Sequence, residues 1–161
     1  TALARLHGAA EIVVTDVQDF TLGIARRMGA DRCVNVAENP EGLADYAQGK
    51  GRIDVVLECS ANPHAIAQAI AVARPQATMV QIGVGGMTPV PLNLIVGREL
   101  HLVGTHRFDV EFAQAVAMIG AGRIDLSPMV TQVLPAAEAQ RAFDLAGDRT
   151  QAVKVQLDFG A

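Results

Sequence analysis

Short apolar segments alternate with segments of helical periodicity along the chain, and this alternation most constrains the fold. The apolar segments predict strands at Ile12–Thr15, Cys33–Val36, Ile53–Glu58, Thr78–Ile82 and Leu100–Gly104. Most of them are apolar nearly throughout, which is typical of strands buried on both faces. Strands separated by helices at the spacing of βαβ units predict an α/β fold with a parallel sheet and helices on both sides.

Helix signals separate these strands. Phe20, Ile24 and Met28 recur at the spacing of one helix face, which is therefore expected to be buried. Asn62 suits a helix N-cap and Pro63 a first helical position, and Pro75 is expected to close that helix. The other main helices expected, with their inward residues, are 109–121 (Phe112, Ala115, Val116 and Ile119) and 135–146 (Ala139, Ala142, Phe143 and Ala146), and 89–94 is expected to be irregular.

The strands match a doubly wound, Rossmann-type dinucleotide-binding sheet that lacks its first strand. Such a sheet has the strand order 3-2-1-4-5-6, with a glycine loop after strand 1. Ile12–Thr15 corresponds to strand 2, and Ala2–His7 to the end of the helix that follows the glycine loop. Strands 2 and 4 would each bury an unpaired edge if strand 1 were missing. We therefore expect upstream residues in the functional protein.

Composition restricts the partners. Hydrophobic residues make up 50% and charged residues 19% of the 161-residue chain, which favours a folded core. The net charge of -4 and the pI of about 5.5 argue against nucleic acid or an anionic membrane as partner. Cys33 and Cys59 form no CxxC motif, so a reducing cytoplasm fits best. No signal peptide and no apolar run of bilayer-spanning length are expected.

Asp16 ends the strand Ile12–Thr15 and is the first candidate site residue. A carboxylate in this position accepts hydrogen bonds from both hydroxyls of an adenosine ribose and repels a 2′-phosphate. The alternative is a helix N-cap, a role that Asp fills well. Asp19 adds negative charge, and no Arg or Lys occurs between Asp16 and Arg26. The pattern therefore favours NAD over NADP.

The ends of the next two strands carry further candidates, because ligands of open α/β sheets bind beyond the carboxyl ends of the strands. Cys59 and Ser60 follow one strand, and we expect them to line the site without performing chemistry. The thiol itself is expected to be a small buried group. Ile82, Gly83 and Val84 follow the other strand, where backbone groups suit a nicotinamide carboxamide, although an ordinary turn explains them as well.

The segment after Leu100–Gly104 supplies the last candidates. Thr105 is expected near the cofactor, and Arg107 can bind a substrate carboxylate or hydroxyl at the mouth of the cleft. A surface salt bridge from Arg107 to Asp109 or Glu111 is about as good an interpretation. His106 is interpreted as structural or exposed, since a lone histidine is seldom a proton shuttle.

These motifs resemble a known family. The segments 11–16, 28–31, 54–60 and 80–83 resemble the cofactor domain of medium-chain, zinc-type alcohol and polyol dehydrogenases. The segments 104–108, 122–129 and 154–157 look like the sorbitol and L-idonate 5-dehydrogenase branch. The resemblance implies NAD(P)-dependent oxidation of a secondary hydroxyl on a polyol or sugar acid, with a zinc ion polarising the alcohol. It places the zinc ligands in an N-terminal domain that these residues do not include.

The resemblance also assigns roles and organisation. It implies that Asp16 binds ribose, that Cys59-Ser60 flank the cofactor, that Gly83-Val84 meet the carboxamide and that Arg107 contacts the polyol. Thr21 departs from the family pattern, which often has an Arg there for adenosine packing. The expected domains are 1–122, nucleotide-binding, and 123–161, which returns to the catalytic domain. A homodimer or homotetramer paired through the last sheet strand is expected, although His101 and Glu99 are equally consistent with protection of that edge.

Two other functions remain open from the sequence. The same sheet serves a module that senses NAD or an adenine nucleotide without chemistry, because fold does not determine function. A zinc-free reductase of the same superfamily is the other alternative.

Overall fold

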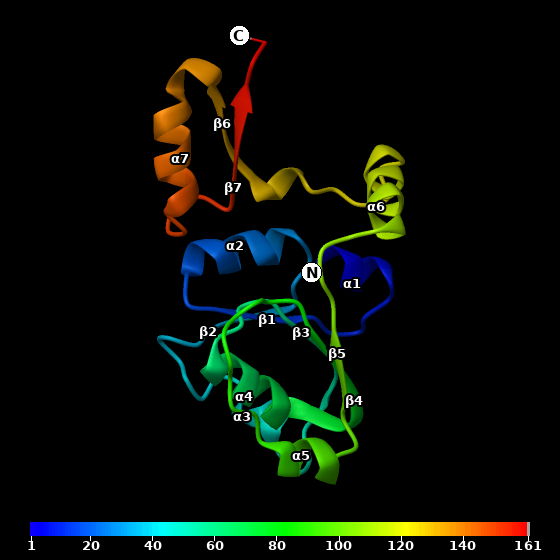
Figure 1. Cartoon of the computed structure of the whole chain (residues 1–161). Helices are drawn as coiled ribbons and strands as arrows, with labels where there is room; N and C mark the ends of the chain where they lie inside the picture. The colour runs from blue at the N-terminus through cyan, green and yellow to red at the C-terminus, as the bar shows by residue number, and fades with distance from the viewer. Residues whose placement is uncertain (161) are drawn as a thin grey trace. The chain divides into compact units, whose positions relative to one another are not determined.

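Helices and strands alternate along the computed structural model, which describes residues 1–160 (Figure 1). The chain divides into two compact units. The first unit combines Thr1–Pro40 with Val110–Ala161, and the second is Glu41–Asp109. Each candidate site residue therefore has to be located within its own unit.

The N-terminal part of the first unit is a small parallel βαβ arrangement. It contains α1 (Ala2–Leu6), β1 (Val13–Asp16), α2 (Asp19–Arg27) and β2 (Arg32–Asn35). The strands β1 and β2 pair in parallel, with Asp16 opposite Asn35. Leu22, Ile24 and Ala25 are the buried residues of α2. The predicted helix face is confirmed at Ile24, whereas Phe20 and Met28 are only half-buried.

The C-terminal part of the first unit contains a second parallel strand pair. Its elements are α6 (Val110–Gly120), η1 (Ser127–Met129), β6 (Val130–Pro135), η2 (Ala136–Glu138), α7 (Ala139–Gly147) and β7 (Lys154–Asp158). Ala142 is buried on α7, as predicted. The inward prediction for Phe143 is wrong, because Phe143 is 71% exposed. Adjacent residues on an α-helix point about 100° apart, so the face that buries Ala142 turns Phe143 outward.

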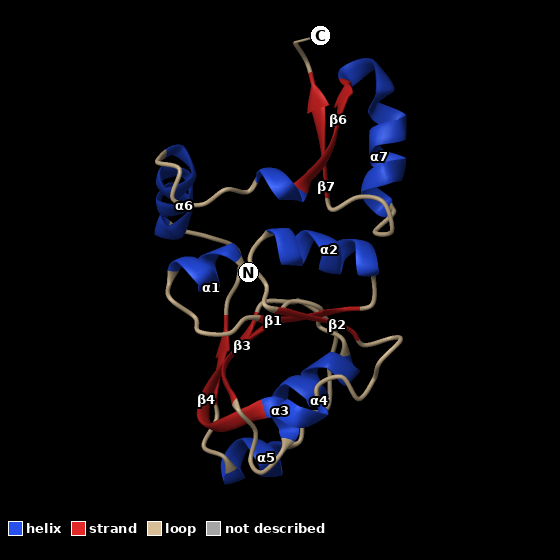
Figure 2. Ribbon diagram, turned by 180° about the vertical axis from the view of Figure 1, so that it is seen from behind, coloured by secondary structure: helices blue, strands red, loops and turns tan. Residues whose placement is uncertain are grey.

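The second unit is a three-stranded parallel sheet in the order β3-β4-β5, with β4 in the centre. Figure 2 shows its helices grouped beside these strands. The elements are α3 (Ala44–Ala47), β3 (Ile53–Glu58), α4 (Pro63–Val72), β4 (Ala73–Gln81), α5 (Leu92–Gly97) and β5 (His101–Gly104). Its core consists of Ile66, Ala69 and Ile70 of α4 with Met79 of β4.

One local prediction for this unit is confirmed and one is wrong. The helix α4 ends at Val72 with its C-cap at Ala73, two residues before Pro75, as expected for a proline that closes a helix. The segment 89–94 is not irregular throughout, because α5 begins within it at Leu92. Leu94 and Ile95 of this helix pack against the core cluster. Proline-rich local sequence did not reveal this helix, because its stabilisation comes from tertiary packing. Asn62 does cap α4, with its side-chain oxygen accepting hydrogen bonds from the His64 and Ala65 N–H groups.

Several apolar surfaces expected to be buried are exposed. In β3, Val55 and Leu57 are 57% and 52% exposed, so one face of that strand is open among the described residues. The helix α6 forms as predicted, but none of its residues, all of which are described, is buried. Phe112 and Val116 are more than half exposed. The physical reason is that the described residues provide no second layer to cover these faces.

The strand pairing agrees with the predicted fold class. The pairs β2-β1 and β3-β4-β5 are all parallel and reproduce the neighbours expected for strands 3-2 and 4-5-6. No described strand corresponds to strand 1 of such a sheet. Residues 1–160 also contain no helix that is long and apolar enough to cross a membrane.

Candidate functional site

The carboxyl ends of β4 and β5, with Ala61 of the loop after β3, surround a pocket of about 440 Å³. The predicted residues Gly83, Val84 and Thr105 line it, together with Gln81 and Gly104. Its apolar lining includes Ile66 and Ile70 of α4, Met79 of β4, and Leu102 of β5. Open parallel sheets bind ligands in this location, so the pocket is the main candidate site of the second unit.

Glu58 lies at the end of β3 and organises the loop beside this pocket. It is 5% exposed and is the one buried charged side chain among the described residues. Its carboxylate accepts hydrogen bonds from the Ser60 N–H (2.9 Å), the Ser60 hydroxyl (2.5 Å), the Ala61 N–H (2.9 Å) and the Gln81 side-chain amide (2.5 Å). The acid therefore ties the end of β3 to the end of β4.

The hydrogen bonds around Glu58 determine its charge. Burial disfavours the carboxylate and would by itself raise the pKa of Glu58. The hydrogen bonds from Ser60, Ala61 and Gln81 outweigh burial and hold the pKa below its ordinary value. Glu58 is therefore an ionised positioning group and does not suit the role of a proton donor near neutral pH.

A close backbone contact joins the loops after β3 and β4. The N–H groups of Ile82 and Gly83 both donate to the Glu58 carbonyl oxygen, at 2.8 and 2.9 Å. A Cβ atom on Gly83 would lie 2.5 Å from the Ala61 nitrogen, so only glycine fits there. Ala61 itself has a φ of 54°, which is unusual for a residue with a side chain. The Gly83 position is thus a steric requirement of this loop pair.

Cys59 and Ser60 lie beside this network and do not line the pocket. The expectation that Cys59 is a small buried group is wrong, since the residue is exposed. Partial burial of the thiol raises the pKa of Cys59, and the Glu58 carboxylate raises it further. The thiol is therefore a poor nucleophile at neutral pH. The Ser60 hydroxyl is engaged with Glu58 and accepts a hydrogen bond from the Asn62 N–H at 3.1 Å.

The remaining candidates of the second unit differ in position. Thr105 lines the pocket, and its N–H donates to the Gln81 carbonyl oxygen at 3.2 Å. Ile82 is 40% exposed and lies outside the pocket lining. Arg107 is exposed, also lies outside the lining, and has a left-handed φ of 59°. The structure therefore brings together Gly83, Val84 and Thr105, but not Arg107.

Asp16 belongs to the first unit, at the end of β1. One carboxylate oxygen accepts hydrogen bonds from the Val17 and Gln18 N–H groups, at 2.7 and 3.0 Å. This is an Asx turn. Asp16 is not the N-cap of α2, because that position is Gln18. Its other oxygen lies 2.7 Å from a guanidinium nitrogen of Arg149.

The sequence does not predict the contact between Asp16 and Arg149. No cation follows Asp16 closely along the chain, and Arg149 lies 133 residues away. No local pattern in the sequence marks it. Gln81 lines the pocket, and Glu58, which does not line it, holds the adjacent loop through Ala61 and Gln81.

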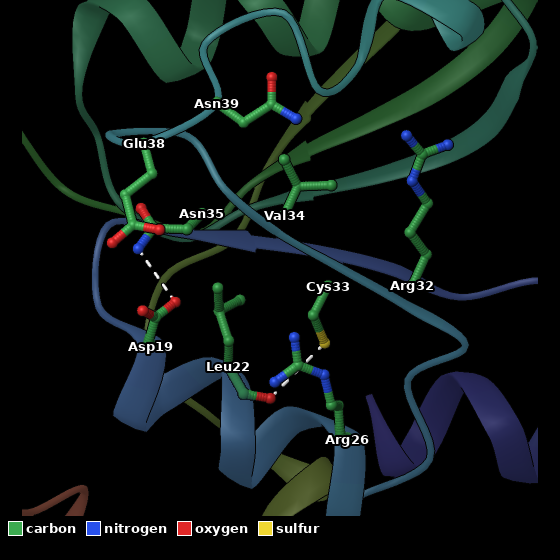
Figure 3. A pocket seen from close by; sticks show the side chains of 9 residues that line it. All are labelled: Asp19, Leu22, Arg26, Arg32, Cys33, Val34, Asn35, Glu38 and Asn39. Carbon is green, nitrogen blue, oxygen red and sulfur yellow. Dashed lines mark hydrogen bonds between the residues drawn. The ribbon is translucent and has the colours of Figure 1, made fainter.

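A second hollow of about 300 Å³ lies between α2, β2 and the loop that follows β2 (Figure 3). The Asn35 side-chain amide donates to Asp19 across its rim at 3.0 Å. The Cys33 thiol donates to the Leu22 carbonyl oxygen at 3.5 Å. Burial raises the pKa of Cys33, although Arg26 partly offsets this effect. The polar groups of this hollow are already hydrogen-bonded to one another in the Asn35–Asp19 and Cys33–Leu22 pairs. The pocket at the ends of β4 and β5 is therefore the stronger candidate for a ligand site.

Comparison with known proteins decides the family. Residues 1–121 match the family model described as zinc-binding dehydrogenase. The chain belongs to this family. The α/β fold and the family resemblance predicted from the sequence are therefore confirmed.

Individual members of this family resemble the chain over nearly its whole length. It is 38% identical over 153 residues to L-idonate 5-dehydrogenase (NAD(P)(+)) of Escherichia coli, covering 94% of this chain and 44% of that protein. It is 31% identical over 152 residues to sorbitol dehydrogenase 1 of Saccharomyces cerevisiae, covering 89% of this chain and 43% of that protein. The crystal structure of the E. coli L-idonate 5-dehydrogenase superposes on this chain with a TM-score of 0.90 at 36% identity. The match covers 98% of this chain and 45% of that structure. The chain spans a little less than half the length of these relatives.

Potential metal ligands are not clustered among the described residues. Residues 1–160 contain no group of three or more His, Cys, Asp or Glu side chains placed to hold a metal ion. The isolated thiols Cys33 and Cys59 lie in different units.

Proposed function

We propose that this chain is the NAD(P)-binding half of a dehydrogenase that oxidises a secondary hydroxyl of a polyol or sugar acid, such as L-idonate. The observation that carries the proposal is the pocket at the carboxyl ends of β4 and β5, beside the loop that follows β3. Family membership supports a nicotinamide cofactor for it, and the similarity to L-idonate and sorbitol dehydrogenases supports the substrate class.

The nicotinamide end of the cofactor would lie in this pocket. The Gly83 N–H donates to Glu58, and its carbonyl oxygen accepts from the Gln81 amide at 3.0 Å. Gly83 therefore shapes the loop, and Val84 is the better candidate to meet the carboxamide with its backbone. Thr105, which directly follows β5, also lines the pocket. Cys59 and Ser60 would border the cofactor from outside the pocket lining.

The adenosine ribose would bind to Asp16. A carboxylate can accept about four hydrogen bonds, and Asp16 accepts three in the structure. The oxygen that faces Arg149 therefore retains capacity for a ribose hydroxyl. The carboxylate supports a preference for NAD over NADP.

The chemistry of the reaction would depend on the rest of the protein. A zinc ion held there would polarise the substrate hydroxyl and lower its pKa, and hydride would pass to the nicotinamide. The chain's own residues would bind and orient the cofactor. Arg107, exposed after β5, is proposed to contact a hydroxyl or carboxylate of the substrate.

The organisation of the full-length enzyme is part of the proposal. Residues 1–122 would form the nucleotide-binding domain, and residues 123–161 would return to a catalytic domain. A homodimer or homotetramer could form along β5, which is an edge strand of its sheet. A cytoplasmic location fits the two free cysteines.

The full-length protein, incubated with NAD+ and L-idonate, sorbitol or threonine, tests this function. We expect NADH absorbance to rise with at least the sugar acid or the polyol. NAD+ binding without turnover of any secondary alcohol would favour a nucleotide-sensing module. Turnover by a protein that contains no zinc on metal analysis would favour a zinc-free reductase instead.

A further inference from the structure

The C-terminal part of the first unit places a cation directly on the proposed ribose acid. Arg149 follows α7, and its guanidinium lies 2.7 Å from Asp16. The Asp16 side chain is 16% exposed and that of Arg149 is 60% exposed. The cation is therefore largely accessible to solvent while it contacts Asp16.

The orientation of the Asp16 carboxylate makes this contact specific. The oxygen bonded to the Val17 and Gln18 N–H groups is held inside the turn. The other oxygen is the one that meets Arg149. The same oxygen is the one left to accept a ribose hydroxyl, so the ligand and Arg149 would share it.

The loop that carries Arg149 is ordered by its neighbour. The Asp148 carboxylate accepts hydrogen bonds from the Thr150 N–H (2.9 Å), the Thr150 hydroxyl (2.6 Å) and the Gln151 amide (2.5 Å). The Gln151 and Ala152 N–H groups also donate to the Asp148 carbonyl oxygen, at 3.1 and 3.0 Å. Arg149 is thus presented from a turn with its own hydrogen bonds, and its position does not depend on the ion pair alone.

A purely stabilising role explains this pair poorly. Ion pairs with a largely exposed partner contribute little to stability, typically less than about 1 kcal/mol. A guanidinium beside a carboxylate does change what the carboxylate can bind. It offsets the negative charge that repels a phosphate, and it offers N–H donors in a fork that fits phosphate oxygens.

We propose that Arg149 is a cofactor-specificity residue that weakens the discrimination of Asp16 against a 2′-phosphate. The inference rests on the proposed function, because it assumes that adenosine ribose binds at Asp16. With a 2′-hydroxyl, Asp16 accepts the hydrogen bond and Arg149 remains its partner. With a 2′-phosphate, Arg149 turns to the phosphate oxygens and reduces the repulsion from Asp16. The protein would then prefer NAD but still accept NADP.

Titration calorimetry of the full-length protein with two adenosine fragments tests this proposal. The fragments are 5′-AMP, with a free 2′-hydroxyl, and 2′,5′-ADP, with a 2′-phosphate. We expect Arg149→Gln to weaken 2′,5′-ADP by about tenfold or more, as for a lost charge-assisted hydrogen bond. The affinity for 5′-AMP is expected to change less than about threefold. Arg149→Lys, which keeps the charge but loses the fork, should fall between wild type and Arg149→Gln for 2′,5′-ADP.

Arg141→Gln is the matched control. It removes a cation that pairs with Glu138 at 2.7 Å on the same C-terminal part of the chain, without any contact to Asp16. It should leave the affinities for both fragments at the wild-type values. The proposal is overturned if Arg141→Gln changes the ratio of the affinities for 2′,5′-ADP and 5′-AMP as much as Arg149→Gln does. The effect would then come from the net charge of the protein and not from Arg149.

The remaining outcomes separate this inference from the proposed function. If wild type binds both fragments and Arg149→Gln weakens both equally or neither, Arg149 is only structural and the inference fails alone. If wild type binds 5′-AMP but no 2′,5′-ADP at all, the inference also fails alone. If wild type binds neither fragment, the ribose site at Asp16 is wrong, and the proposed function loses its support together with this inference.

Discussion

Glu58 and Asp16 both end parallel strands on a carboxylate, but their surroundings give them different tasks. Glu58 is 5% exposed and is satisfied by neutral groups, namely the loop residues Ser60 and Ala61 and the Gln81 amide of the neighbouring strand β4. Asp16 is less buried and pairs with a cation from a distant part of the chain. A buried acid that is bound by local N–H groups holds backbone in place. An acid with an accessible oxygen and an exchangeable partner can serve a ligand. The same residue chemistry at the same place in a fold therefore does not predict the same role.

Removing the Glu58 carboxylate should have the largest effect. Glu58→Ala leaves the Ser60 and Ala61 N–H groups without this acceptor, and it removes one of the two acceptors of the Gln81 amide. Hydrogen bonds to a charged group contribute about 1.5–3 kcal/mol each, and the partial exposure of these donors reduces that contribution, so we expect a loss of roughly 3 kcal/mol in the free energy of unfolding. Urea denaturation of the full-length protein measures it. Glu138→Gln, which breaks an exposed pair with Arg141, is the control and should cost less than about 1 kcal/mol.

The stability of the protein in acid should also depend on Glu58, because the pKa of this carboxyl is held below its ordinary value. An acid with a lowered folded-state pKa stabilises the fold above its unfolded-state pKa, and this contribution is lost as the pH falls through the folded-state pKa. Wild type should therefore lose more stability below the ordinary pKa of 4.5 than Glu58→Gln does. Parallel stability curves for the two proteins in acid would show that the carboxylate is not the stabilising form.

Gly83→Ala should have the next largest effect, because its Cβ would collide with the Ala61 backbone nitrogen. Forcing atoms into a filled space costs about 1–3 kcal/mol, and the shifted loop should also weaken NAD+ binding. Thermal unfolding and NAD+ titration of the full-length protein measure both. Gly86→Ala is the matched control, since a Cβ there meets no atom within 4 Å. Equal effects of the two substitutions would contradict the steric role of Gly83.

Asp16→Ser should have the smallest effect on stability and a selective effect on the cofactor. We expect NAD+ affinity to fall by about tenfold and the gap between NAD+ and NADP+ to narrow, because the acceptor for ribose hydroxyls and the charge that repels phosphate are both lost. Titration of the full-length protein with each cofactor measures the ratio. Tighter binding of NADP+ than NAD+ by wild type would show that Asp16 has been assigned the wrong role.

Local patterns predicted the regular elements well where the chain's own periodicity produced them. The strands around Asp16 and Glu58 and the Asn62 cap of α4 were all predicted from short segments. The helix α5 and the outward side chain of Phe143 were not, because both depend on what packs against them. The apolar face of α6 was predicted as buried, and it is exposed because no described layer covers it. Sequence periodicity indicates which face is apolar, whereas packing decides whether that face is covered.

By itself, the sequence determined the α/β class, the parallel strands and the positions of carboxylates and glycines at their ends. These properties follow from local rules of periodicity, capping and turn chemistry. Only the tertiary structure decided that Glu58 is satisfied by Gln81 from the next strand, and that Arg149 reaches Asp16 from the end of the chain. Contacts between residues so far apart along the chain depend on how the elements pack, and no local pattern encodes them. The partners of these two similar acids, and not their common place at a strand end, make their surroundings different.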